Sequence, residues 1–255
     1  MIRIAKHVLY DILRNRFVVF YTIFLLIITF SLFSLDSDAG KASLSLLNII
    51  LLAVPLVSVI FTTIHFFNSY EFIELLLSQP IHRSVIFFGE FAAVVLALSV
   101  AYLVGVGFPL FIMYPNPSSI VMLLAGLLLT WVFVALAFLA SVSTRDKAKG
   151  IGIALLFWFY FSLIYDGFLL YIMYSFSDYP LEKVTLALAS LNPIDLARIS
   201  ILLKLDISAL MGYTGAFYKN FFGTYLGIFY SFGMLLLWII VPFFLARRRF
   251  LSKDI

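Results

Sequence analysis

Long apolar stretches alternate with short polar segments along almost the whole chain. Six stretches reach the roughly 20 residues that cross about 30 Å of hydrocarbon as an α-helix. Helices are the expected form, because an open strand would leave backbone groups unpaired in lipid, and the alternation typical of barrel strands is missing. The predicted spans are residues 17–35, 46–67, 85–113, 120–142, 151–174 and 221–246.

Composition agrees with this fold class. The 255 residues are 64% hydrophobic and 12% charged, whereas soluble domains are about 45–50% apolar. Cysteine is absent, which rules out disulfides, thiolate metal sites and cysteine nucleophiles. We predict an all-α integral membrane protein that forms one transmembrane domain, residues 1–255, without a separate soluble domain.

Lysine and arginine predict the orientation of the spans. With the N-terminus in the cytoplasm, 12 of the 17 basic residues fall in cytoplasmic segments, in agreement with the positive-inside rule. Both termini are therefore expected in the cytoplasm. The five basic residues on the other side are Lys41, Lys183, Arg198, Lys204 and Lys219.

Residues 1–16 predict a helix ahead of the first span. Ile4, Val8 and Ile12 recur every four residues, with Arg3 and Lys6 elsewhere on the helix. This pattern is typical of a basic amphipathic helix on the inner membrane surface. A secretory signal peptide is the alternative, but its charged and apolar regions are shorter than those found here, so an uncleaved first span is favoured.

Residues 175–220 form a long segment on the outer side. Asn192, Pro193 and Asp195 have the pattern of a helix start: a capping side chain, a proline in the first turn and a carboxylate near the positive end of the helix dipole. An apolar face follows, with Arg198 beside it. Such a segment is too apolar for open water and too broken to span, so we expect short re-entrant or interfacial helices at the outer surface.

Residues 70–83, YEFIELLLSQPIHR, concentrate charge between the second and third spans. The pattern predicts a short amphipathic helix that ends near Pro80, with apolar side chains on one side and carboxylates on another. A hairpin of a few residues would connect the spans, so such a helix favours docking to a cytoplasmic partner. The expected docking residues are Tyr70, Glu71, Phe72, Ile73, Glu74, Leu76, Leu77, Gln79 and Arg83.

Two other interpretations of this segment compete with docking. One is a solvated loop without a partner. The other is a zinc or catalytic site built from His65, Glu71, Glu74 and His82, but their spacing matches neither HExxH nor its inverse. We therefore predict no metal site in this chain.

Asp166 lies within the fifth predicted span. A carboxylate there costs about 2.5–3.5 kcal/mol on insertion scales, which favours a partner or a water-filled path. One interpretation is a coupling or gating contact with residues 192–198. The other is a protonated carboxyl group bonded to a neighbouring Tyr or Ser.

These features resemble the permease subunits of ABC-2 type (type V exporter-like) transporters. The resemblance lies in six spans with both ends inside, the N-terminal helix, the pattern YEF(x)ELLLSQP(x)HR and the outer segment before the last span. It implies that residues 70–83 are the coupling helix, and that the partners are a second copy of the chain and a separate ATPase. It also implies a multi-pass protein of a bacterial or archaeal cytoplasmic membrane, in contact with lipids and not with nucleic acid.

The phosphate-binding pattern GxxxxGK[ST] occurs nowhere in the chain. ATP and Mg²⁺ are therefore expected on the partner ATPase, and this chain is predicted to be non-enzymatic and without a cofactor of its own. A stand-alone membrane enzyme or a channel is the alternative from another class.

The second half carries a narrower resemblance, to NosY-type permeases of the ABC complex that supports copper-site maturation of nitrous oxide reductase. It lies in FWFYFSLIYDGFLL, LNPIDLARI and SALMG, and it implies a periplasmic accessory protein as a further partner. Glu90 departs from the pattern, because such permeases commonly carry lysine there. The matching positions are Asp166, Asn192, Pro193, Asp195, Arg198, Ala209, Met211 and Gly212.

A second function within the same class is the export of a lipid, a drug or a polysaccharide. Movement of copper through the spans is not expected, because the methionines form no MxxM or MxM pair and cysteine is absent. Conformational work on a periplasmic partner is favoured over metal translocation.

Overall fold

The computed structural model describes residues 2–36, 38–176, 182–205 and 225–252, and every element within them is helical. Six of its helical segments are long and apolar enough to cross a membrane, which confirms the six predicted spans. They comprise α2 (Arg16–Leu35), α3 (Ala39–Asn68), α5 (Arg83–Tyr102) with η1 (Leu103–Gly107) and α6 (Phe108–Met113), α7 (Pro117–Ser143), α8 (Lys147–Phe159) with η2 (Tyr160–Ile164) and α9 (Tyr165–Ser175), and α13 (Tyr225–Ser252).

The predicted and observed ends agree to within a few residues, except at the start of the second span and at the end of the last, where the prediction ends at Ala246 and α13 continues to Ser252. Hydropathy predicts its start at Leu46, but α3 begins at Ala39. The Asp38 side chain caps this helix by accepting a hydrogen bond from the Gly40 amide at 2.9 Å. The cap stabilises the first turns of α3, which contain polar residues and therefore do not stand out in a hydropathy profile. At the last span, residues 221–224 of the prediction lie outside the described part.

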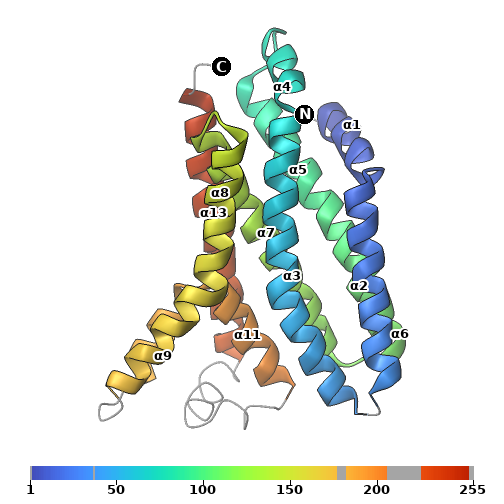
Figure 1. Ribbon diagram of the computed structural model, residues 1–255, viewed down its shortest axis with the longest axis vertical. Coiled ribbons are helices and arrows are strands. Elements are labelled where there is room, and N and C mark those ends of the chain that lie inside the picture. Colours follow the sequence, from blue (N-terminus) through green and yellow to red (C-terminus); the bar gives the residue numbers. More distant parts are fainter. Residues whose placement is uncertain (1, 37, 177–181, 206–224, 253–255) are drawn as a thin grey trace.

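The spans run up and down between two ends of one bundle (Figure 1). One end carries α1 (Ile2–Leu13), α4 (Tyr70–Leu77) and the last turns of α13, and is called the terminal end below. The opposite end carries α6, α9 and α11 (Pro193–Lys204). The connection between α3 and α5 therefore lies at the same end as α1 and the last turns of α13.

Helix α7 forms the centre of the bundle, where it contacts α3, α5, α11 and α13. In its most apolar stretch 67% of the residues are buried, against 17% in the span formed by α8 and α9. Near the terminal end, aromatic rings join three spans: Phe87 and Phe91 of α5 pack on Phe138 of α7, and Phe91 lies 4.6 Å from Phe243 of α13 between ring centroids. The three spans are thus held together directly below the terminal end.

Four shorter helices complete the described structure. Helix α1 is present as predicted, and its buried Val8 and Ile12 belong to the same core as α5, which α1 contacts. Its position at a membrane surface stays a prediction. Helix α10 (Glu182–Ser190) precedes α11, and the predicted helix start at Asn192 is confirmed, because the Asn192 side chain accepts a hydrogen bond from the Ile194 amide. Residues 177–181 and 206–220 of the predicted outer segment lie outside the described part.

Gly126 of α7 is expected to tolerate no side chain. A Cβ added there would overlap the ring of Tyr102, whose hydroxyl donates to the Met122 carbonyl oxygen at 3.1 Å. Overpacking of this kind costs about 1–3 kcal/mol. We expect Gly126→Ala to lower the thermal midpoint of the purified protein, while Gly152→Ala in α8, with no described heavy atom within 4 Å of the added Cβ, should not. Equal midpoints in the two variants would contradict this packing.

Candidate functional sites

The first candidate site is α4, at the terminal end. Only Ser69 separates it from α3, and its last residue, Leu77, lies shortly before the predicted stop at Pro80. Helix α5 begins at Arg83, so the two spans beside α4 meet it within a few residues. Helix α4 contacts both α3 and α5. Any displacement of α4 therefore acts directly on these two spans.

The structure divides the predicted apolar face of α4 into two parts. Ile73 and Leu76 are 1% and 8% exposed and belong to the core, whereas Phe72 and Leu75 are 40% and 58% exposed. Ile73 and Leu76, predicted as docking residues, thus pack against the bundle, whereas the exposed Leu75 is not among the predicted docking residues. The reason is that the bundle itself supplies a surface for one side of the helix, which hydrophobic periodicity alone does not reveal.

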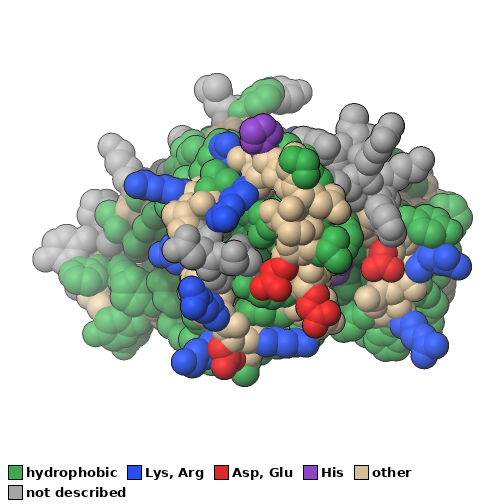
Figure 2. All heavy atoms as spheres, turned by 90° about the horizontal axis from the view of Figure 1, so that it is seen from above, with side chains coloured by type: hydrophobic (Ala, Val, Ile, Leu, Met, Phe, Trp, Pro, Cys, Tyr) green, Lys and Arg blue, Asp and Glu red, His purple; other side chains and the backbone are tan. Residues whose placement is uncertain are grey.

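The outward side of α4 combines apolar and acidic side chains. Glu71, Glu74 and Gln79 are exposed together with Phe72 and Leu75. Tyr70, Leu77 and Arg83 are partly buried. Figure 2 looks onto the terminal end and shows Lys and Arg side chains spread over this face, with Asp and Glu side chains among them. This surface offers apolar contact surrounded by charge, a combination that typically marks an interaction site.

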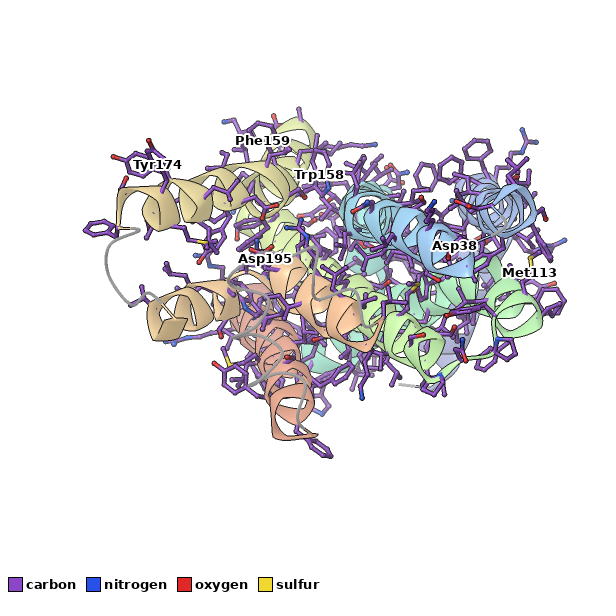
Figure 3. All side chains as sticks on the ribbon, turned by 90° about the horizontal axis from the view of Figure 1, so that it is seen from below. Asp38, Met113, Trp158, Phe159, Tyr174 and Asp195 are labelled. Carbon is purple, nitrogen blue, oxygen red and sulfur yellow. The ribbon has the colours of Figure 1, made fainter. Side chains whose placement is uncertain are left out.

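The second candidate site is a cluster of polar side chains near the opposite end. Asp166 lies in the first turn of α9, directly after the π-helical segment η2. Asn192 is the N-cap of α11, and Asp195 and Arg198 follow in that helix. Figure 3 looks from below and places Asp195 toward the middle of the bundle, whereas Tyr174 at the end of α9 extends outward. We call Asp166, Asn192, Asp195 and Arg198 the outer cluster.

Arg198 joins the two carboxylates of the outer cluster. Its Nη1 forms an ion pair with Asp166 Oδ2 at 2.9 Å and donates a hydrogen bond to Asp195 Oδ1 at 3.0 Å. The first contact connects α9 to α11, and the second lies within α11. The partner of Asp166 is thus an arginine of the 192–198 segment rather than a Tyr or Ser, in agreement with the first of the two predicted arrangements. A coupling or gating role for this contact stays a prediction.

Asn192 connects the outer cluster to the π-helical segment. Its buried side chain donates through Nδ2 to the Phe161 carbonyl oxygen at 3.0 Å and to Asp195 Oδ2 at 2.9 Å. π-Helical turns inside α-helices are rare and frequent at functional sites. The fifth span is therefore bound to α11 at two points, through a backbone carbonyl of η2 and through the Asp166 carboxylate. Pro193 starts α11 beside these contacts.

The environment of Asp195 in the outer cluster changes the pKa of its carboxyl group. Burial raises its pKa from 3.8 to about 7, because water no longer stabilises the charged form. The positive charge of Arg198 lowers the pKa of Asp195, and the neighbouring Asp166 carboxylate raises it. The described residues contain no group of three or more His, Asp or Glu that could hold a metal ion. The cluster is suited to holding two helices together in a way that depends on a proton.

Comparison with known proteins places this architecture among membrane transporters. The sequence profile of the family described as "ABC-2 family transporter protein" matches residues 2–255. The chain is 32% identical over 148 residues to the "Probable ABC transporter permease protein NosY" of Pseudomonas aeruginosa, and this match covers 54% of each chain. It is 29% identical over 135 residues to a protein of the same name from Stutzerimonas stutzeri, covering 49% of each. The matches span about half the length of these curated relatives.

The Asp195 carboxyl group should make stability depend on pH. Its pKa is 3.8 in an exposed position and about 7 in the fold, so between these values the folded chain binds more protons than the unfolded chain. Its stabilising contribution is therefore complete below about pH 4 and lost as the pH rises through about 7. We expect Asp195→Asn to flatten the fall of the thermal midpoint over this range.

Asp146→Asn is the matched control for this prediction. Asp146 is the exposed N-cap of α8 and accepts a hydrogen bond from the Lys149 amide at 3.0 Å. Asparagine also caps helices well, so this variant should keep the slope of the parent chain. If Asp195→Asn and Asp146→Asn have the same pH profile, Asp195 is not the group that titrates.

Proposed function

The chain belongs to the ABC-2 family of transporter proteins, and on that premise we propose that it is the permease subunit of a complex whose separate ATPase binds and hydrolyses ATP. The match to the family over residues 2–255 and the six spans support this assignment. The absence of a phosphate-binding GxxxxGK[ST] pattern from the sequence requires another polypeptide for the nucleotide. ATP and Mg²⁺ then belong to that polypeptide.

The ATPase binds at the terminal end, which faces the cytoplasm in this proposal. The observation that carries it is the division of α4 into two sides. Ile73 and Leu76 anchor the helix in the core, while Phe72 and Leu75 are exposed beside two carboxylates. An anchored helix with an outward apolar side can receive force from a partner and pass it to the spans. A solvated loop without a partner would require neither a buried anchor nor an exposed apolar side.

Movement of α4 can reach the opposite end through α3 and α8. The Lys147 ammonium group at the start of α8 donates to Asn68 Oδ1 at 2.8 Å, and the Trp158 indole donates to the Leu52 carbonyl oxygen at 3.2 Å. These two contacts bind α8 to α3 along much of its length. The same span continues through η2 to Asp166, so a shift of α3 is passed to the outer cluster.

Two copies of the chain form the transport unit in this proposal, because an ATPase pair that holds two nucleotides needs two permease halves. The work is delivered to a periplasmic partner in the copper-site maturation of nitrous oxide reductase. The resemblance of the second half to NosY-type permeases and the NosY name of both curated relatives support this choice over export of a lipid, a drug or a polysaccharide. Co-purification from the native membrane tests it, since an exporter requires no dedicated periplasmic partner.

Replacing an exposed apolar side chain of α4 by an acidic one should weaken ATPase binding. We expect Phe72→Asp or Leu75→Asp to reduce the amount of co-purified ATPase at least about tenfold, which corresponds to the loss of one contact of about 1.4 kcal/mol. The thermal midpoint of the permease alone should not change, because both side chains are exposed. His82→Ala, at an exposed position of the same connection, serves as the control. Undiminished ATPase association in both α4 variants would rule out α4 as the docking helix.

Replacement of Asp166 by Asn tests the outer cluster. The variant removes the charge that binds Arg198 across α9 and α11, so we expect lower transport or maturation activity with normal membrane insertion. Asp166→Glu keeps the charge and should retain part of the activity. Asp36→Asn, at the same end of the bundle, should behave as the parent chain. Full activity of Asp166→Asn would remove this contact from the mechanism.

A further inference from the structure

A second acidic side chain lies inside the bundle, at the base of the connection that carries α4. Glu90 belongs to α5 and is 2% exposed. Its Oε2 lies 3.3 Å from Nε2 of His65, which stands in the last turn of α3 and is 10% exposed. The pair therefore joins the two spans that flank α4, just below that helix. Neither the sequence pattern nor the family resemblance predicts this contact.

The surroundings of Glu90 provide little else to stabilise a charge. Neither of its carboxylate oxygens has a hydrogen-bond partner of good geometry among the described residues. A buried carboxylate without a counter-charge costs several kcal/mol, whereas a pair of zero net charge avoids most of this cost. One proton held between His65 and Glu90 gives zero net charge. Without that proton the pair carries one negative charge in the core.

His65 connects this pair to a water-accessible space. It lines a cavity of about 430 Å³ together with Asp11, Asn15, Asn68 and Ser69. Asp11, Asn15 and Asn68 are exposed, so the cavity reaches the surface at the terminal end. The Ser69 hydroxyl, in the single residue between α3 and α4, lies 3.5 Å from His65 Nε2. A proton can therefore reach the imidazole from this end without crossing the apolar core.

The charged groups around the pair come from few elements. Helix α1 contributes Asp11 across the cavity, and α8 contributes Lys147, whose ammonium group is bound to Asn68. Helix α2 borders the cavity through the uncharged Phe17, and Phe61 of α3 stacks on the imidazole at 5.8 Å between ring centroids. Helix α7, which packs on α3, contains no titratable side chain. The titratable side chains of α4 are Tyr70, Glu71 and Glu74, and they lie on partly or fully exposed sides of that helix. Helix α13 also packs on α5 and brings Arg247 to Ser84 and Phe88. Among the described residues, the ion-pair partner within 4.0 Å of the Glu90 carboxylate is His65.

We propose that His65 and Glu90 form a proton-binding site, filled and emptied through the cavity at the terminal end, that closes the contact between α3 and α5 below α4. When the proton is bound, the imidazolium Nε2–H faces the Glu90 carboxylate and the pair has no net charge. When the proton leaves, Glu90 is an unpaired buried anion and the contact loosens. The effect on α4 as a docking helix rests on the proposed function, but proton binding itself does not.

The test uses the purified full-length chain in detergent, without ATPase, so that its result is independent of the proposed function. Thermal midpoints are recorded between about pH 5 and pH 9, the range that brackets ordinary histidine titration. All variants carry Asp195→Asn, which removes the titration of the outer cluster. We expect the midpoint of this parent to fall by at least about 4 °C toward alkaline pH, because the pair loses its proton.

Single and double variants separate proton binding from a purely structural role. Glu90→Gln should lose the alkaline fall, since an amide needs no proton. His65→Gln should lower the midpoint at every pH, and the double variant should be more stable than His65→Gln alone, because removing both partners leaves no unpaired carboxylate. His82→Gln, an exposed histidine in the same connection, should keep the parent profile.

Two results would overturn the proposal. One is an alkaline fall in Glu90→Gln as large as in the parent chain. The other is a double variant less stable than His65→Gln, which would mean that the Glu90 carboxylate needs no proton from His65. Loss of ATPase binding by α4 variants with an intact pH response would instead contradict only the proposed function.

Discussion

The scarcity of hydrogen-bond partners in hydrocarbon governs this structure. Every backbone N–H and C=O group within the membrane must be bonded inside its own segment, which leaves helices as the spanning form. The same constraint makes buried charge costly, so an acidic side chain inside the bundle requires a partner. Asp166 has Arg198 and Glu90 has His65. The two pairs lie near opposite ends, at places where spans must be held to one another.

The described contacts form a continuous mechanical connection between these ends. Helix α4 is anchored by Ile73 and Leu76 and is separated from α3 by one residue. Hydrogen bonds from Lys147 and Trp158 attach α8 to α3, and the same span leads to the outer cluster. Helix α7, at the centre, packs on α3, α8 and α11 along this connection. An input at α4 thus has a short path of packed and hydrogen-bonded side chains to Arg198.

Both ends of this connection carry a buried acidic side chain. Burial raises the pKa of Asp195 to about 7 in the outer cluster, and the proposed His65–Glu90 site faces the terminal end through its cavity. They lie where α11 meets α9 and where α5 meets α3.

The amino-acid sequence by itself determined the six spans, the start of α11 and the presence of a short helix before α5, because apolar length, capping side chains and proline act locally along the chain. It also indicated that Asp166 needs a partner, since a carboxylate in a span is too costly to stand alone, but it left open whether the partner is the 192–198 segment or a neighbouring Tyr or Ser. Only the tertiary structure decided which side of α4 faces outward, that Leu75 belongs to that side, and that Glu90 meets His65. These features depend on how a neighbouring helix covers each surface, and no local pattern contains that information.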